Sequence, residues 1–130
     1  MMQNFYQGIE NAVYDPVAGI RIARLQNGSE MNAFGTRMDK GAKVSSHVHT
    51  QGDEWYSILD GEGVIYLADW VGEVVQNRRH FPVRKGDVFC LQANTAHQIY
   101  AHTQLDLIFY CPDTHLGTDR TVLDDLLVQP

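Results

Sequence analysis

Short runs of strand-forming residues, separated by turn signals, recur along most of the 130-residue chain. The turn signals are groups such as Asn27-Gly28, Asp60-Gly61 and Lys85-Gly86-Asp87, in which glycine and asparagine favour tight turns. Strands are predicted at residues 19–25, 32–38, 54–59, 64–68, 81–83, 88–91, 97–101 and 105–111. Residues 69–79 form a longer connection with no assigned structure. Turn signals spaced roughly every 8–12 residues are typical of an all-β sandwich or barrel.

The two ends of the chain lie outside this pattern. Residues 1–15 are predicted to form an N-terminal arm or short strand, and residues 122–128 a short helix or a closing tail. The length fits a single domain, residues 1–130, with a barrel core at about residues 20–111. With 44% hydrophobic and 20% charged residues, the composition is that of a globular chain that buries one core.

Charge and composition exclude several classes of function. The formal net charge of −6 argues against nucleic acid or an anionic membrane as a partner. The apolar runs are far shorter than a membrane span requires, and residues 1–15 lack the features of a signal peptide, so we expect a cytoplasmic location. Cys90 and Cys111 lie in apolar runs and are expected to be buried free thiols.

Residues 41–61 contain the side chains that suggest a metal-binding site. His47 and His49 are two residues apart, so on an extended strand both imidazoles point to the same face, where they can share one metal ion. Gly52 allows a tight turn that returns the Glu54 carboxylate over the two histidines. Strand alternation after Glu54 then directs Tyr56 and Ile58 to the interior, and Trp55 and Ser57 away from it. The sequence therefore predicts three metal ligands on one strand–turn–strand unit.

The spacing of these residues resembles the first conserved motif of the cupin superfamily. That motif is matched at every fixed position by Gly41-x5-His47-x-His49-x4-Glu54-x6-Gly61. Its spacing is specific, whereas a histidine pair alone would be weak support.

The second cupin motif, G-x5-P-x-G-x2-H-x3-N, is matched only in part. Gly86 and His97 are present, while Gln92, Asn94 and Ala101 replace the proline, the second glycine and the final asparagine. Asn94 is a mild replacement for glycine, because asparagine tolerates left-handed backbone better than most residues. The resemblance spans about residues 34–110.

The resemblance implies a jelly-roll β-barrel that binds one divalent metal ion inside it. The implied ligands are His47, His49, Glu54 and His97, and three nitrogens with one carboxylate oxygen suit Fe, Mn, Ni, Cu, Co or Zn. Four protein ligands leave positions open for a substrate, water or dioxygen. The resemblance also implies a homodimer.

The function that follows is a metal-dependent enzyme for a small oxygen-rich or anionic molecule, similar to dioxygenase-like and decarboxylase-like cupins. A non-catalytic barrel that binds a sugar and a metal-dependent sugar isomerase stay open as alternatives. No catalytic acid or base stands out. Candidate residues for the pocket are Gln51, Tyr56, Tyr66, Phe109 and Arg37. Of the histidines outside the motifs, His80 is expected in a loop and His102 in a turn. His115 in the tail is expected in solvent, with a position over the barrel mouth as the alternative.

Overall fold

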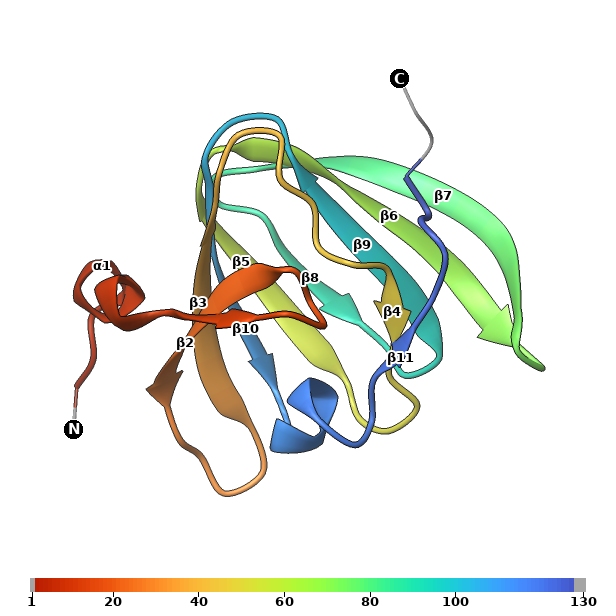
Figure 1. Ribbon diagram of the computed structural model, residues 1–130, viewed down its shortest axis with the longest axis horizontal. Coiled ribbons are helices and arrows are strands. Elements are labelled where there is room, and N and C mark those ends of the chain that lie inside the picture. Colours follow the sequence, from red (N-terminus) through yellow and green to blue (C-terminus); the bar gives the residue numbers. More distant parts are fainter. Residues whose placement is uncertain (1, 128–130) are drawn as a thin grey trace.

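Two antiparallel sheets face each other in the computed structural model, which describes residues 2–127 (Figure 1). The first sheet has the order β1-β2-β3-β10-β5-β8, and the second has the order β11-β4-β9-β6-β7. The first comprises β1 (Val13–Asp15), β2 (Ile20–Gln26), β3 (Asn32–Met38), β10 (Leu105–Cys111), β5 (Glu54–Asp60) and β8 (Val88–Leu91). The second comprises β11 (Thr121–Val122), β4 (His47–Val48), β9 (Thr95–Ala101), β6 (Glu62–Val71) and β7 (Val74–Arg84). This arrangement is the all-β jelly-roll barrel that the sequence predicts.

Alternation of buried and exposed residues explains the main core, which fills the space between the sheets. Along β5, Glu54, Tyr56 and Ile58 are buried, while Trp55 is exposed, as the alternation predicts. The same period buries Phe34 and Met38 on β3 and Leu105, Leu107 and Phe109 on β10. Both cysteines are free, Cys111 being fully buried and Cys90 partly so.

Residues 69–79 differ from the sequence-based expectation of a connection. They form the far end of the long β6–β7 hairpin, in which Asp69 pairs with Gln76 and Val71 with Val74. Gly72 and Glu73 make the turn with φ of 57° and 64°, the two left-handed residues of a type I′ turn. The turn is hard to predict because glutamate rarely adopts left-handed backbone.

The N-terminal arm contains more helix than expected. It folds into α1 (Phe5–Gly8) and η1 (Ile9–Asn11) before β1. The Asn4 side chain accepts a hydrogen bond from the Tyr6 amide and caps α1. Phe5 packs so closely over β3 that a Cβ on Gly35 would lie 2.9 Å from its ring. The arm is therefore fixed to the outer face of the first sheet.

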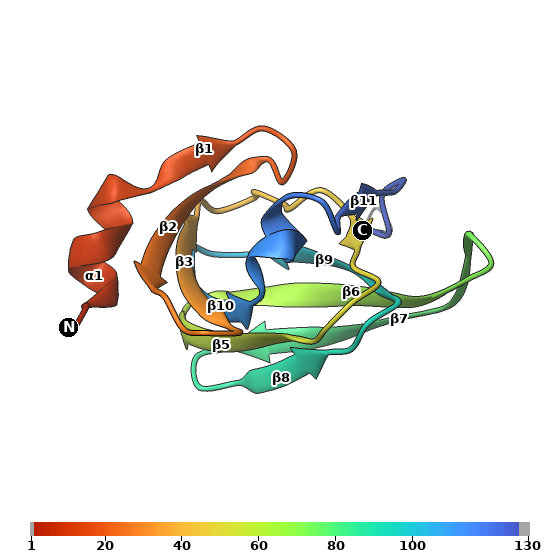
Figure 2. The same ribbon diagram turned by 90° about the horizontal axis from the view of Figure 1, so that it is seen from below.

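The C-terminal segment crosses from one sheet to the other at the end of the barrel seen in Figure 2. It comprises η2 (Asp113–Leu116), β11, which pairs with β4, and an irregular tail. Residues 123–127 form a closing tail and no helix, and Val128 lies outside the described residues. Between residues 2 and 127, no helix has the length and apolar character needed to cross a membrane.

Candidate metal centre

His47, His49, Glu54 and His97 converge at the end of the barrel that the C-terminal segment covers. His47 on β4 lies directly opposite His97 on β9 in the antiparallel pair. The turn between His49 and Glu54 contains Gly52 at a φ of 81°, the left-handed backbone that the predicted tight turn requires. It places Glu54, the first residue of β5, in front of the histidines.

The ligand atoms of these side chains lie within 4.8 Å of one another, and all four residues are buried. The Glu54 Oε2 atom is 3.1 Å from His49 Nε2 and 3.3 Å from His97 Nε2. None of these atoms has a hydrogen-bond partner of acceptable geometry in the described structure. Buried polar atoms without partners are costly, so the cluster requires a further group among them.

The backbone carbonyls beside the three histidines indicate what kind of group belongs among the ligand atoms. They determine which imidazole nitrogens carry protons and which carry lone pairs. The Nδ1 atom of each histidine faces a carbonyl oxygen: Ser45 O at 2.7 Å from His47, Asp119 O at 2.6 Å from His49, and Thr95 O at 2.9 Å from His97. Each Nδ1–H therefore donates to a carbonyl, and we assign a lone pair to each Nε2. Metal-binding histidines usually donate their other ring N–H to a carbonyl or carboxylate oxygen in this way. Three nitrogen lone pairs and a carboxylate oxygen facing one point fit a divalent cation.

The pKa shifts agree with a neutral histidine beside an ionised carboxylate. Burial lowers the pKa of His47 to about 3, so its imidazole is neutral at pH 7. Burial alone would raise the pKa of Glu54, but the ring nitrogens of His49 and His97 facing its oxygen hold that pKa well below the ordinary value. A cation bound among these atoms would also favour the ionised carboxylate. The carbonyl contacts at Nδ1 favour the cation.

A small cavity of about 30 Å³ opens beside the cluster, room for about two water-sized groups. Tyr56 and Phe109, two of the candidate pocket residues, line it. Burial, with a smaller contribution from the Glu54 carboxylate, raises the pKa of Tyr56 well above its usual value, so its phenol stays protonated. Most of the remaining wall is aliphatic: Ala18, Ile20, Ile22, Val44, Ile99, Leu107 and Leu116.

Three residues predicted for the pocket lie elsewhere, and these assignments were wrong. Strand alternation places Arg37 on the outer face of β3, where its guanidinium pairs with both carboxylate oxygens of Asp106 at 2.8 and 3.0 Å. Tyr66 packs in a separate cluster on the outer face of the second sheet, beside the His80 ring. The Gln51 side chain is exposed, and only its carbonyl oxygen faces the site.

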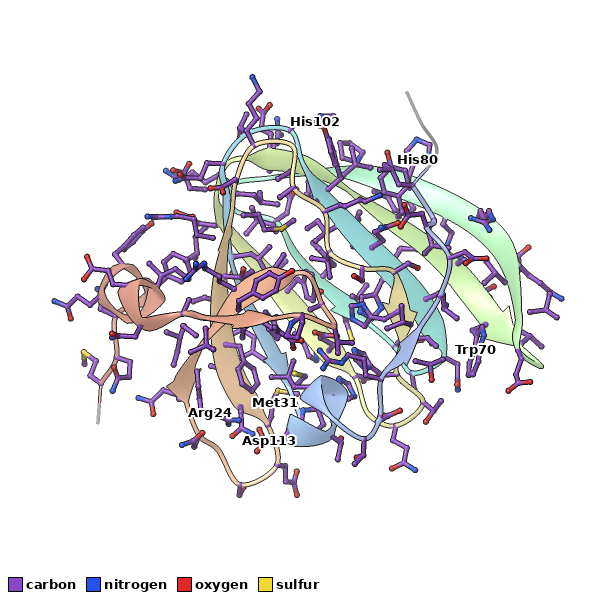
Figure 3. The ribbon with its side chains drawn as sticks, viewed as in Figure 1. Arg24, Met31, Trp70, His80, His102 and Asp113 are labelled. Atoms are coloured by element: carbon purple, nitrogen blue, oxygen red, sulfur yellow. The ribbon has the colours of Figure 1, made fainter. Side chains whose placement is uncertain are left out.

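His115 is the histidine whose environment the sequence did not reveal. It was expected in solvent, but it is only 1% exposed and lines the cavity. Its ring stacks on His49 with centroids 3.9 Å apart and planes within 2°. Burial lowers the pKa of His115. Figure 3 shows His80 and His102 towards the opposite end of the barrel from Asp113, the first residue of η2, so these two do not join the site.

Arg120 is the arginine that reaches the cavity, in place of the predicted Arg37. Its side chain is 9% exposed, and one guanidinium nitrogen lies 2.7 Å from a carboxylate oxygen of Asp15. The other terminal nitrogen donates to the Leu116 carbonyl at 3.0 Å. No motif identifies Arg120 or His115, because both depend on where the C-terminal segment crosses the barrel.

The fold and this cluster define a class: a jelly-roll barrel with a buried three-histidine, one-carboxylate site that fits a metal ion. The chain belongs to the cupin family, since the family model for the cupin domain matches residues 36–112. No curated protein matches it in sequence.

Solved structures share the fold at low sequence identity. Hydroquinone 1,2-dioxygenase from Sphingomonas sp. TTNP3 with 4-hydroxybenzoate bound has a TM-score of 0.67 at 15% identity, over 85% of this chain and 72% of that chain. A predicted oxalate decarboxylase from Thermotoga maritima has a TM-score of 0.67 at 19% identity, over 86% and 98%. KdgF from Halomonas sp. has a TM-score of 0.64 at 19% identity, over 86% and 93%. These similarities show the fold alone.

Proposed function

We propose that the protein is an enzyme with one divalent transition metal ion, held by His47, His49, Glu54 and His97. The observation that carries the proposal is the convergence of four buried ligand residues whose ligand atoms lie within 4.8 Å of one another. Three of these atoms, His49 Nε2, Glu54 Oε2 and His97 Nε2, have no hydrogen-bond partner among the described residues. When bound, the ion would act as a Lewis acid or, as iron, bind dioxygen.

The residues around the cluster define what the substrate must offer. The aliphatic wall and Phe109 fit an apolar body, while the protonated Tyr56 and the charged Arg120 fit oxygen atoms. A divalent ion with one carboxylate ligand keeps a net positive charge, which favours an anionic group. We therefore propose a small organic acid as the substrate.

Dioxygenase-like or decarboxylase-like chemistry suits such a substrate best. Among the structures with this fold are a dioxygenase bound to 4-hydroxybenzoate and an oxalate decarboxylase–formate complex. In this chain, the acid would bind beside the ligand cluster on the side that Arg120 lines, and the aliphatic wall would exclude water from the reacting bond. The same wall offers few partners for sugar hydroxyls, so it supports neither the sugar-binding barrel nor the sugar isomerase.

Metal analysis of protein purified without a histidine tag tests the proposal. We expect about one metal ion per chain in the wild type and less than a tenth of that in His47→Ala and His97→Ala. His80→Ala, which removes an exposed histidine, is the matched control. Dioxygen uptake and carbon dioxide release are then measured with small aliphatic and phenolic acids. A wild type that binds no stoichiometric metal would refute the metal site, and metal binding without turnover would favour the binding barrel.

The proposal also includes a cytoplasmic homodimer formed by single-domain chains. Support for a dimer comes from β1, an edge strand of the first sheet that exposes Val13 and Tyr14. Exposed apolar side chains beside an unpaired strand edge favour association. Sedimentation velocity of the wild type and of Val13→Lys measures this directly, and a monomeric wild type would contradict it.

A further inference from the structure

His115 lies in contact with the ligand cluster without belonging to it. The side chain comes from η2, more than 60 residues after the first ligands, and is 1% exposed. Its Nδ1 atom is 3.9 Å from Glu54 Oε2. This nitrogen is buried and has no hydrogen-bond partner in the described structure. The His115 side chain lines the cavity beside the cluster.

The proton on the His115 ring can be located from its other nitrogen. Nε2 lies 2.6 Å from the Gln51 carbonyl oxygen, which can only accept. Nε2 therefore carries the hydrogen, and Nδ1 of the neutral ring presents a lone pair. A group that satisfies Nδ1 must bring an O–H or N–H donor.

Ring geometry excludes His115 as a further ligand of the same ion. Its plane is parallel to the His49 ring within 2° and stacked on it, with centroids 3.9 Å apart. Imidazole donates its lone pair within its own plane, so the lone pairs of two stacked, parallel rings would not point at one common ion. The free Nδ1 therefore faces a molecule beside the ion.

We propose that His115 is a positioning residue that accepts a hydrogen bond from a hydroxyl group of the substrate beside the metal ion. The inference rests on the proposed metal site and narrows the substrate from small organic acids to small hydroxy acids. The Nδ1 acceptor orients the hydroxyl oxygen towards the ligand cluster. An acid without a hydroxyl leaves this buried nitrogen unpaired, which weakens its binding.

The test compares two probes that differ in one hydroxyl group, lactate and propionate, on the Zn²⁺-loaded protein. Their dissociation constants are measured by calorimetry, so the readout needs no turnover. We expect the wild type to bind lactate more tightly than propionate. In His115→Phe the ratio of the two affinities should fall about tenfold, since such a hydrogen bond is worth roughly 1.4 kcal/mol. The affinity for propionate should change less than twofold. His115→Asn, which restores an acceptor oxygen, should recover part of the preference.

The control is His102→Phe, the same substitution at an exposed histidine, which should leave both constants unchanged. Circular dichroism and the zinc stoichiometry of each variant establish that it is folded and loaded. An equal lactate preference in the wild type and His115→Phe, or no preference in the wild type, would overturn the role of His115. Failure of the wild type to bind zinc would instead overturn the proposed metal site, so the two failures are distinguishable.

Discussion

Asp119 connects the C-terminal segment to the turn between the metal ligands, and its removal should affect both stability and metal binding. Its carboxylate accepts hydrogen bonds from the Thr50 amide at 2.8 Å, the Thr50 hydroxyl at 2.9 Å and the Gln51 amide at 2.8 Å. Burial alone would raise the pKa of Asp119, but these bonds outweigh burial and lower it. The carboxylate is therefore ionised at pH 7 and holds the turn.

The size of the expected loss of stability follows from these three hydrogen bonds. Hydrogen bonds to charged groups contribute about 1.5–3 kcal/mol each, and bonds that share one acceptor do not add fully. We therefore expect Asp119→Ala to lower the free energy of unfolding by about 2–4 kcal/mol. Asp119→Asn should cost less, because the amide keeps one acceptor oxygen and turns a donor towards a backbone N–H.

Metal affinity should fall together with stability. The Asp119 carbonyl accepts the Nδ1–H of His49 at 2.6 Å, so the residue also orients a ligand ring. Asp119→Ala keeps this backbone carbonyl but removes the side-chain bonds that hold it in place, so metal affinity should fall by at most the roughly 10–100-fold that loss of a ligand's supporting hydrogen bond costs. A smaller effect on metal affinity than on stability would mean that the ring holds its orientation without the carboxylate.

Urea unfolding of metal-free protein, followed by circular dichroism, measures the stability change, and zinc titration against a chromophoric chelator measures the affinity. Asp124→Asn, an exposed acid in the same tail, controls for the change in charge. An Asp119→Ala protein within about 0.5 kcal/mol of wild type, a change typical of surface positions, would refute the reasoning.

Two other perturbations give independent checks. Acidification from pH 7 to 5 should lower the stability of the metal-free protein by up to about 1.4 kcal/mol per pH unit. The reason is that the pKa of His47 is 6.5 in the unfolded chain and about 3 in the folded protein, so only the unfolded state takes up a proton in this range. Urea midpoints measure this, and His47→Gln should flatten the slope; a midpoint that rises with acid would contradict it. Gln98→Leu should release the tail, because the buried Gln98 amide oxygen accepts hydrogen bonds from the Leu126 and Leu127 amides at 2.8 and 2.9 Å. Hydrogen exchange at these amides should accelerate at least tenfold, and unchanged protection would rule the idea out.

The ligand cluster was predictable because its geometry is encoded in short spacings. Two residues on a strand share a face, and a glycine turn returns the chain, so the positions of His47, His49 and Glu54 follow from local rules. The backbone at Asn94 was predictable for a similar local reason. The family motif has glycine at this position, and Asn94 adopts left-handed backbone with a φ of 65°.

The cavity wall was less predictable because long-range packing decides it. Arg37 is a chemically reasonable clamp, but alternation along β3 turns it outwards to Asp106. His115 and Arg120 reach the cavity only because the segment after β10 crosses the barrel, held there by Asp119 and Gln98. Contacts between residues some 65 positions apart, such as that of His115 with Gln51, leave no periodic signal in the sequence.

The charges around the cavity indicate which acids it can hold. With a divalent ion bound, the single carboxylate of Glu54 leaves the cluster with one positive charge. Arg120 adds no net charge, because Asp15 already neutralises it at 2.7 Å. One anionic group therefore balances the site, whereas a dianion leaves an excess buried charge unless Arg120 exchanges Asp15 for the second acid group. Asp15 is partly exposed and can be solvated when released. A monoanionic hydroxy acid therefore balances the charge of the site without displacing Asp15 from Arg120.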